Sequence, residues 1–335
     1  MNNMDIILEK HTKKEFSDYS LTMDVGGTAT LIGIVGINKD KSLELAYSTT
    51  VWTKEIKSIY HFINQLIDFA HKEFKIKIHK TGISFAGPIK NGKSKLTHAD
   101  LKIDIEKLKK KCNLKKAILM NDFEALGYSI NIFKEAKKET RPIAVIGAGT
   151  GLGKAILIHD KNHYVPHPSE GGIADFPIRN EEDLQLSKII TKNKRAMEQE
   201  ELVSGKGIEY IYEYLRKHKK IKGSKHTKKI DNSKEKIFLI EKYKDDDATS
   251  KEALRMFSIY FARIIKNFAL ETLPHGGIYL AGGIIIRNQE LIGKDFFKEL
   301  GNLTRNQQII KNIDIRIIKQ KDVSLLGAAY ALEHS

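Results

Sequence analysis

Asn121 and Asp122 stand at a change of pattern, in the run "AILMNDFEALGYSINIF". The apolar residues 117–120 predict a short buried strand, and a helical spacing follows at Phe123, Leu126, Ile130 and Phe133. Asn121 is a favoured helix N-cap, and Glu124 three residues later completes a capping-box pattern. A carboxylate at the end of a strand can also accept a proton from a substrate hydroxyl. The pair therefore begins a helix, carries chemistry, or does both, since Asn121 can cap while Asp122 stays available.

Two glycine-rich turns have the composition of phosphate-binding loops. Glycine lets the backbone approach a ligand closely, so that successive N–H groups can point at phosphate oxygens. Threonine hydroxyls add donors, and a carboxylate such as Asp24 can hold a hydrated Mg²⁺. A tight hairpin alone would explain either turn singly. The first turn, "DVGGT", contains Asp24, Gly26, Gly27 and Thr28, and the second, "GAGTGLG", contains Gly149, Thr150 and Gly151.

The second turn is not a dinucleotide fingerprint. That fingerprint needs a strand followed by a helix. Here the apolar run "KAILI" follows, which predicts a second strand, and the lysine-serine pair of a P-loop is missing. A third glycine pair, Gly282 and Gly283 in "LAGG", follows another predicted strand.

The elements that must position these residues repeat once along the chain. Residues 19–37 and 141–158 each predict strand, glycine turn and strand, which indicates a duplicated, two-lobed fold. Further predictions are a helix within 53–76, a strand at 80–89, a turn into an extended segment at 91–97 and a closing helix at 323–335. Residues 181–270 are mostly helical by pattern. The basic stretch 216–236 has few apolar residues and predicts an exposed loop or insertion of unknown role.

Length and composition narrow the class of protein. A chain of 335 residues predicts two domains, and one cysteine, Cys112, excludes an internal disulfide framework and fits a reducing cytoplasm. No apolar run reaches membrane-spanning length, and the charged start is unlike a signal peptide. We therefore expect a cytoplasmic protein without a membrane partner. The net charge of +15 is spread along the chain without interleaved aromatic residues, so we expect no specific nucleic-acid partner.

The ordered set of motifs resembles the bacterial-type glucokinases, within the superfamily of sugar kinases, Hsp70 and actin. The matching runs are "DVGGT", "FAGPIKNG", "MNDFEALGY", "IGAGTGLG", "SEGGIADF", "EELVSGKGIEYIY", "GGIYLAGGI" and "LLGAAYAL". They extend from about residue 20 to the end of the chain. The resemblance implies a two-lobed α/β actin-like ATPase (ribonuclease H-like) fold with an interdomain cleft. We expect a small lobe of residues 1–122, completed by the helix 323–335, and a large lobe of residues 123–322.

The resemblance also implies roles for individual residues. Asp122 of the "NDF" motif would be the catalytic base, and "DVGGT" and "GAGTG" would be the phosphate loops, with Mg²⁺ held near Asp24 through water. Gly282 and Gly283 would lie against the adenosine. Asn121, Glu170 and Glu200 would bind sugar hydroxyls, although the glutamate-rich run "MEQEE" leaves Glu201 as an alternative to Glu200.

Two positions depart from the family pattern. The family sequence Glu-Gly-Gly-His is Glu170-Gly171-Gly172-Ile173 here, so a polar contact to the sugar is missing. Its loss would weaken binding by about 1 kcal/mol, or would make room for another sugar. His167 could substitute from the other side of the turn. Ala29 replaces the asparagine of the family's "GGTN".

Three functions follow as hypotheses. The first is an ATP-dependent glucokinase acting on the 6-hydroxyl of glucose, with ATP and Mg²⁺ as cofactors and a homodimeric state implied by the resemblance. The second keeps the mechanism but changes the acceptor to another hexose or an amino sugar. The third is a sugar or nucleotide sensor without turnover. Phosphate loops bind phosphates more than bases, so the sequence leaves ATP, ADP and polyphosphate open as donors.

Overall fold

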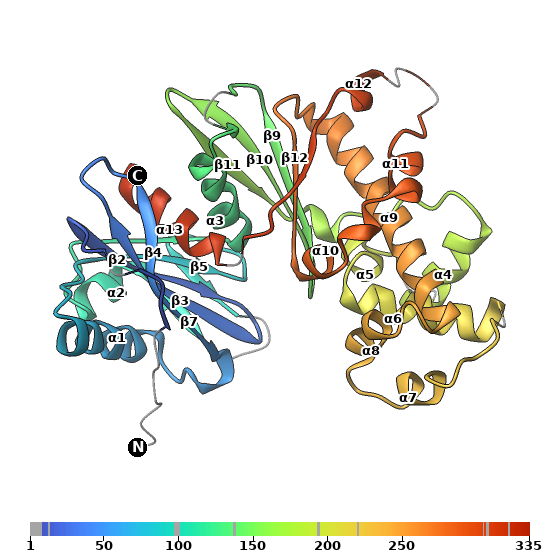
Figure 1. Cartoon of the computed structure of the whole chain (residues 1–335), viewed down its shortest axis with the longest axis horizontal. Helices are drawn as coiled ribbons and strands as arrows, with labels where there is room; N and C mark the ends of the chain where they lie inside the picture. Colours follow the sequence, from blue (N-terminus) through green and yellow to red (C-terminus); the bar gives the residue numbers. More distant parts are fainter. Residues whose placement is uncertain are drawn as a thin grey trace. The chain divides into compact units, whose positions relative to one another are not determined.

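The chain forms two compact units, each built on one mixed β-sheet with helices (Figure 1). The computed structural model describes residues 9–12, 14–96, 101–136, 139–192, 195–219, 221–303, 305, 308–320 and 322–335. Unit 1 consists of residues 1–140, 158–168 and 320–335, and unit 2 of residues 141–157 and 169–319. Among the described helices, none combines the length and the apolar composition needed to cross a bilayer.

Unit 1 contains a six-stranded sheet in the order β1-β4-β3-β2-β5-β8. Strands β2, β3 and β4 pair antiparallel, whereas β5 pairs parallel with both β2 and β8. The strand bounds are Glu9–Lys10 (β1), Asp18–Val25 (β2), Ala29–Ile37 (β3), Leu43–Trp52 (β4), Lys80–Phe85 (β5) and Lys116–Met120 (β8). A separate two-stranded ribbon pairs β6 (Lys93–Lys95) with β7 (Lys102–Asp104).

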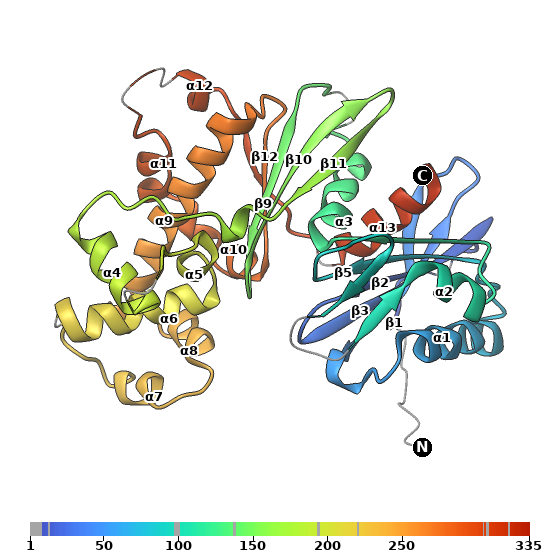
Figure 2. The same cartoon turned by 180° about the vertical axis from the view of Figure 1, so that it is seen from behind.

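The sheet of unit 1 carries helices on both faces (Figures 1 and 2). Alternate residues of β2, such as Met23, are buried against α1 (Ile59–Phe74) and α2 (Ile105–Lys111). On the other face, α13 (Val323–His334) packs against α3 (Asp122–Ser129) and β5. Gly327 permits this close approach, because a Cβ there would lie 1.8 Å from the carbonyl oxygen of Ala125. The alternation of β2 therefore turns Asp24 toward the α13 side.

Unit 2 is built on the sheet β11-β10-β9-β12-β13, whose hairpin end at residues 158–168 belongs to unit 1. Strand β9 pairs antiparallel with β10 and parallel with β12, which pairs parallel with β13. The bounds are Ile143–Ala148 (β9), Leu152–Asp160 (β10), His163–Ser169 (β11), Ile278–Ala281 (β12) and Ile315–Ile317 (β13). Glycine turns therefore close two neighbouring strand ends, those of β9 and β12.

Helix α9 (Ala248–Thr272) is the centre of the unit 2 core. Buried side chains along its length, such as Phe257 and Phe261, pack with the sheet and with the helices around it. The other helices are α4 (Glu181–Thr191), α5 (Gln199–Leu202), α6 (Gly205–Tyr214), α7 (Thr227–Asp231), α8 (Lys236–Lys242), α10 (Gly283–Arg287), α11 (Lys294–Leu300) and α12 (Gln308–Lys311). The prediction of a mostly helical segment at 181–270 is thus confirmed.

The predicted hairpins at 19–37 and 141–158 are confirmed, as are the strand at 80–89 and the closing helix. The predicted extended segment at 91–97 is confirmed for β6, while Thr97 lies outside the described residues. The prediction of an exposed loop at 216–236 is wrong for residues 216–219, which belong to a π-helical turn, and for residues 227–231, which form α7 with Ile230 fully buried. Asp247 holds this region, since Ser224 Oγ and Thr227 Oγ1 lie 2.6 and 3.1 Å from its Oδ2. Lys220 of the stretch lies outside the described residues.

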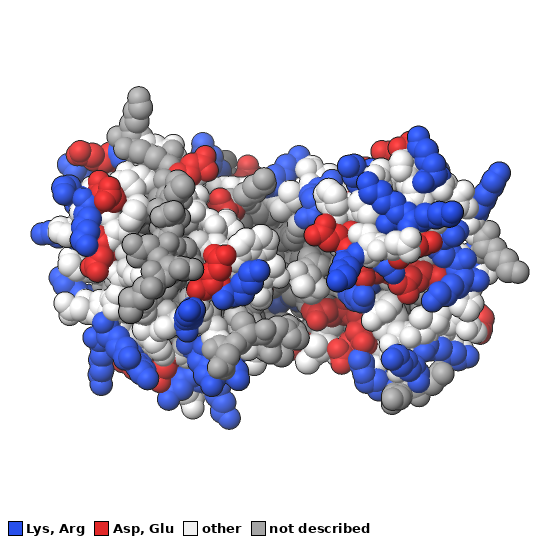
Figure 3. Space-filling view, turned by 90° about the horizontal axis from the view of Figure 1, so that it is seen from below, with Lys and Arg blue, Asp and Glu red and all other residues white. Residues whose placement is uncertain are grey.

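The basic residues are not gathered into one field on the face shown in Figure 3. Lysine and arginine side chains alternate there with aspartate and glutamate.

Candidate active site

The end of β8 and the start of α3 form a complete capping box. Asn121 Oδ1 accepts hydrogen bonds from the N–H groups of Phe123 (2.6 Å) and Glu124 (3.3 Å). The N–H group of Asn121 in turn donates to Glu124 Oε2 at 2.8 Å. Both lone pairs of the Asn121 oxygen are thereby used, so its NH₂ group is the part that can bind a ligand.

Asp122 is the first residue of α3, and its side chain is partly exposed. Its Oδ1 accepts a hydrogen bond from the N–H group of Phe123 at 3.0 Å. The partial positive charge of a helix N-terminus favours the ionised form of a carboxylate placed there. The local fold therefore places the Asp122 carboxylate at the first turn of α3 while Asn121 caps the helix.

Glu124 and His167 adjoin the same helix start. Burial raises the pKa of Glu124, and the hydrogen bond from Asn121 and the charge of His167 oppose this rise. His167 itself is exposed at the end of β11, in the part of that strand that belongs to unit 1. The structure thus places His167 in the unit of Asp122, whereas Glu170 belongs to unit 2.

Asp24 is the next-to-last residue of β2, beside the first glycine turn, and is held by two serines. Its Oδ1 accepts from Ser84 on β5, and its Oδ2 accepts from Ser324 in the first turn of α13 at 2.7 Å. Burial raises the pKa of Asp24; both serine hydrogen bonds lower it, and the charge of Asp322 raises it further. The sequence analysis missed both serines; Ser84 is the register partner of Asp24 on the neighbouring strand, a pairing that the structure reveals.

A magnesium ion fits Asp24 through water. Within the described residues no group of three or more His, Cys, Asp or Glu side chains could hold a metal ion. Mg²⁺ commonly uses one or two carboxylates together with waters and substrate phosphates, rather than a cage made by the protein. A single carboxylate oriented by two hydroxyls next to a phosphate-type turn is a donor set of that kind.

The first glycine turn is held by hydrogen bonds to its carbonyl oxygens and has free space beside Gly27. Thr53 donates its backbone N–H to the Thr28 carbonyl oxygen (2.9 Å) and its Oγ1 hydroxyl to the Gly26 carbonyl oxygen (2.7 Å). A Cβ at Gly27 would meet no atom within 4 Å. Carbonyl oxygens are therefore bound to the protein on one side, and the side of Gly27 has room for a ligand.

The second glycine turn is assembled with the other glycine motifs of unit 2. The N–H group of Gly149 donates to the Gly151 carbonyl oxygen (2.8 Å), and the Gly149 carbonyl oxygen accepts from Gly205 at the start of α6 (2.9 Å). Gly283 is the nearest neighbour to a Cβ at Gly149, with its nitrogen at 3.9 Å. Thr150 at the tip is exposed. Residues 149–151, 205 and 282–283 thus form one glycine-lined surface.

Gly282 is the one member of this surface with a backbone that excludes a side chain. Its φ is +94°, and a Cβ would lie 2.2 Å from the carbonyl oxygen of Ala148 at the end of β9. The parallel strands β9 and β12 end side by side at this point. The glycine is required for that close approach.

Glu200 contacts both the second glycine turn and the Glu170 turn. Its Oε2 accepts a hydrogen bond from the Leu152 N–H group at 2.9 Å. A Cβ added at Gly151 would lie 2.4 Å from this oxygen, and one at Gly172 would lie 3.6 Å from it. Glutamate at 200 therefore borders the glycine-lined surface.

Glu201 is occupied in a different way. Burial alone would raise the pKa of Glu201, but hydrogen bonds from Arg195 and from the Glu198 N–H group hold it below its ordinary value. The two Arg195 contacts measure 2.6 and 2.8 Å. Of the two alternatives from the sequence, this geometry favours Glu200 for ligand binding.

The Glu170 turn exposes the residue that departs from the family pattern. Gly171–Ile173 form a short 3₁₀ turn, closed by a hydrogen bond of 3.1 Å from the Ile173 N–H group to the Glu170 carbonyl oxygen. The side chain of Ile173 is 58% exposed, and Glu170 is exposed as well. Lys154 packs behind this turn and was not predicted from the sequence, although it is the one charged residue in the apolar run "LGKAILI".

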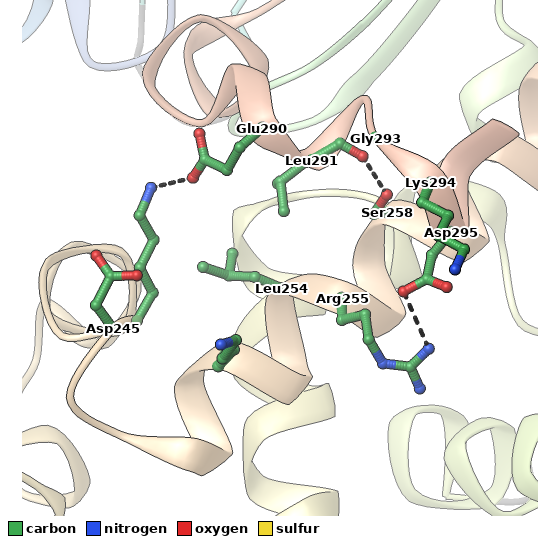
Figure 4. A pocket seen from close by; sticks show the side chains of 11 residues that line it. Asp245, Leu254, Arg255, Ser258, Glu290, Leu291, Gly293, Lys294 and Asp295 are labelled. Atoms are coloured by element: carbon green, nitrogen blue, oxygen red, sulfur yellow. Dashed lines mark hydrogen bonds and ion pairs between the residues drawn. The ribbon is translucent and has the colours of Figure 1, made fainter.

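A cavity of 280 Å³ lies elsewhere in unit 2 (Figure 4). Leu254 and Leu291 form its apolar part, and charged side chains surround them. These charges pair with one another, Lys244 with Glu290 and Arg255 with Asp295. None of the sequence-predicted site residues lines this cavity, so we do not assign the substrate to it.

Comparisons with known proteins agree on one family. The family model described as glucokinase matches residues 21–335. The glucokinase of Trichormus variabilis is 32% identical over 336 residues, which cover 92% of this chain and 97% of the relative. The glucokinase of Synechocystis is 27% identical, with coverage of 94% and 98%.

Solved structures share the fold. The crystal structure of a glucokinase from an Antarctic psychrotroph has a TM-score of 0.78 at 22% identity and covers 95% of this chain and 99% of that one. A glucokinase from Balamuthia mandrillaris in complex with glucose has a TM-score of 0.76 at 19% identity, with coverage of 94% of each chain. At these identities the likeness concerns the fold, which is the two-lobed α/β actin-like ATPase fold that the sequence predicted.

Proposed function

This chain belongs to the glucokinase family, and we propose that it transfers the γ-phosphoryl group of ATP to the 6-hydroxyl of glucose. Membership makes the chain an ATP-dependent hexose kinase. The choice of glucose and the roles of individual residues below are our proposal. The observation that carries them is the capping box, which orders Asn121 and leaves the Asp122 carboxylate at the first turn of α3.

Asp122 acts as the general base. Its carboxylate accepts the proton of the sugar 6-hydroxyl as the oxygen attacks the γ-phosphorus of ATP. A bond forms between this oxygen and phosphorus, the bond from the γ-phosphorus to the bridging oxygen breaks, and ADP leaves with that oxygen. Phosphoryl transfer needs chiefly alignment and charge neutralisation, so a base that is held in place and kept ionised is a sufficient protein group for the proton.

The glycine turns hold the nucleotide. Backbone N–H groups near Gly27 and Thr28 in unit 1, and at Thr150 and Gly151 in unit 2, bind phosphate oxygens. Gly282 and Gly283 lie against the adenosine. Asp24 would hold Mg²⁺ through water, and this ion supplies neutralisation of the charge on the phosphate oxygens.

The sugar hydroxyls are bound by carboxylates and one amide. Glu170 and Glu200 accept hydrogen bonds from hydroxyls, and the NH₂ group of Asn121 donates one. Hydrogen bonds to charged groups contribute about 1.5–3 kcal/mol each, which is enough to select a hydroxyl pattern. These three residues therefore determine which sugar is accepted, together with the sugar substituent that faces Ile173.

Turnover of Mg²⁺-ATP across a panel of hexoses tests the proposal. The panel contains glucose, mannose, glucosamine, N-acetylglucosamine and no sugar, and the product is identified by ³¹P NMR. We expect glucose to give the largest kcat/KM and glucose 6-phosphate as the product. Turnover of ATP at the same rate with every sugar and without sugar would contradict the proposal.

A kinase of another hexose or amino sugar is the second candidate, and Ile173 favours it. An exposed isoleucine cannot hydrogen-bond a hydroxyl, and an apolar wall accepts a larger or less polar substituent. If mannose or an N-acetyl sugar gives the largest kcat/KM in the same panel, this candidate replaces the first while the mechanism stays the same.

A further inference from the structure

Lys154 is a buried lysine that makes no ion pair with a carboxylate of the described residues, and it lies behind the segments of unit 2 that carry Glu170 and Glu200. It belongs to β10 and is 5% exposed. Its Nζ donates a hydrogen bond to the neutral amide oxygen of Gln199 at 2.5 Å and lies 5.5 Å from the centre of the Phe268 ring. Within the described residues it forms no ion pair. Burying an unpaired charge costs free energy of folding, which suggests that Lys154 has a function.

A second buried lysine of the same unit shows the usual solution. Lys266 is 1% exposed, and its Nζ contacts Glu299 Oε1 at 2.8 Å and two backbone carbonyl oxygens at 2.9 and 3.0 Å. Lys266 therefore has a counter-ion and a full set of acceptors, as a structural lysine requires. Lys154 has neither.

The contacts of Lys154 lead to both carboxylate-bearing segments. Gln199, which receives its hydrogen bond, directly precedes Glu200 in α5. On the other side, a Cβ added at Gly171 would lie 3.0 Å from Lys154 Cδ and 3.4 Å from Nζ. The lysine side chain therefore packs directly against the Glu170 turn. The two segments are also joined directly, because the Gln199 N–H group donates to the Ala174 carbonyl oxygen at 2.9 Å.

The electrostatic surroundings make the charge of Lys154 adjustable. Burial lowers the pKa of Lys154 to about 8, and the charge of the exposed Glu271 on α9 opposes this effect. Other titratable side chains lie on the elements around it: Glu200 and Glu201 on α5, Arg263 and Lys266 on α9, His163 and His167 on β11, and Glu170 and Asp175 next to the 3₁₀ turn. Among them Arg263 and Lys266 are ion-paired with Asp183 and Glu299, whereas Lys154 forms no ion pair within the described residues.

We propose that protonated Lys154 is a positioning residue of the sugar site. It holds the segments of Glu170 and Glu200 in their relative positions through Gly171 and Gln199. The inference rests on the proposed function and names a determinant of sugar affinity. When Lys154 loses its proton, its hydrogen bond to Gln199 weakens, and the segment that carries Glu200 is held less firmly against the Glu170 turn. Sugar affinity then falls, while the proton transfer at Asp122 is untouched.

Steady-state kinetics of Lys154→Met test the proposal. Methionine keeps the apolar stem and removes the charge, so we expect the KM for glucose to rise about tenfold, with kcat and the KM for ATP within about twofold of the parent. The parent KM for glucose should also rise as the pH passes 8, and this rise should be absent in Lys154→Met. Lys154→Arg, which stays protonated, should keep a low KM across the same pH range.

Lys266→Met is the matched control. It removes a buried lysine of the same unit, so it should lower the melting temperature but leave the KM for glucose and its pH profile unchanged. If Lys154→Met behaves like this control, Lys154 is merely structural and the inference is overturned. The same holds if the parent KM does not change through pH 8. If Lys154→Arg does not fold, the methionine variant and the parent pH profile still decide.

The two proposals fail in different ways. If no sugar stimulates turnover by the parent protein, the proposed function is wrong and this inference falls with it. If a sugar is phosphorylated normally and Lys154→Met leaves its KM unchanged, only the inference is wrong.

Discussion

The carboxamide oxygen of Asn121 accepts hydrogen bonds from the N–H groups of Phe123 and Glu124. The neighbouring Asp122 carboxylate accepts a hydrogen bond from the Phe123 N–H group. The capping pattern was visible in the sequence because it depends on residues three apart. The serines that hold Asp24 were not, because Ser84 and Ser324 are 60 and 300 residues away from it. Local chemistry is thus readable from the sequence, and support from distant residues is not.

The exposed side chain of Ile173 allows the missing polar contact to be restored. In Ile173→His we expect the KM for glucose to fall about fivefold, the equivalent of about 1 kcal/mol for one hydrogen bond. Fold stability should not change, because the side chain is 58% exposed. Ile178→His, at another exposed isoleucine (44% exposed), is the control and should leave the KM as it is. An unchanged or higher KM in Ile173→His would show that Ile173 does not face the sugar.

Loss of charge at Glu200 and at Glu201 should affect different properties, the KM for glucose in the first case and fold stability in the second. Glu200→Gln keeps an oxygen for the Leu152 N–H group but removes the carboxylate, so we expect the KM for glucose to rise about tenfold or more. Glu201→Gln loses its ion pair with Arg195, which is half exposed, and we expect a stability loss below about 1 kcal/mol without a change in KM. The reverse pattern in steady-state kinetics would assign the sugar contact to Glu201.

At the scale of elements, the hairpins and their glycine turns were predictable because strand alternation and glycine are local signals. The loop prediction failed at α7 for a physical reason. One apolar residue, Ile230, and hydrogen bonds to Asp247, 20 residues on from Thr227, order a stretch whose composition is that of a solvated segment. The same limit hid Lys154, since its partner Gln199 is 45 residues away.

The junction of β9 and β12 should not tolerate a side chain. We expect Gly282→Ala to lower the free energy of unfolding by about 1–3 kcal/mol or more, because both its φ and the Ala148 carbonyl oxygen oppose a Cβ. The KM for ATP should rise as well. Chemical denaturation measures the first effect, and Gly27→Ala, where a Cβ meets no atom, is the control for stability. Equal stabilities of the two variants would contradict the described junction.

For the whole molecule, the buried charge of Lys154 predicts how stability depends on pH. Its pKa is about 8 in the folded state against an ordinary value of 10.5. Between these values the unfolded state binds more protons, so the stability of the parent should increase with pH, by up to about 3 kcal/mol in total. Denaturation of the parent and of Lys154→Met at pH 7.5 and 10 isolates this effect as a difference. A difference that does not change with pH would show that Lys154 is not perturbed.

Asp122→Asn tests the central claim most directly, with kcat for glucose phosphorylation and the dissociation constant of glucose measured on the same preparation. Asparagine retains the shape of the side chain and a hydrogen-bonding oxygen at the first turn of α3 but cannot take the proton. We predict that kcat falls by about 10²–10⁴ while the dissociation constant of glucose stays within a few-fold. A kcat within about fivefold of the parent would contradict the account, because the carboxylate would then cap a helix and do nothing more.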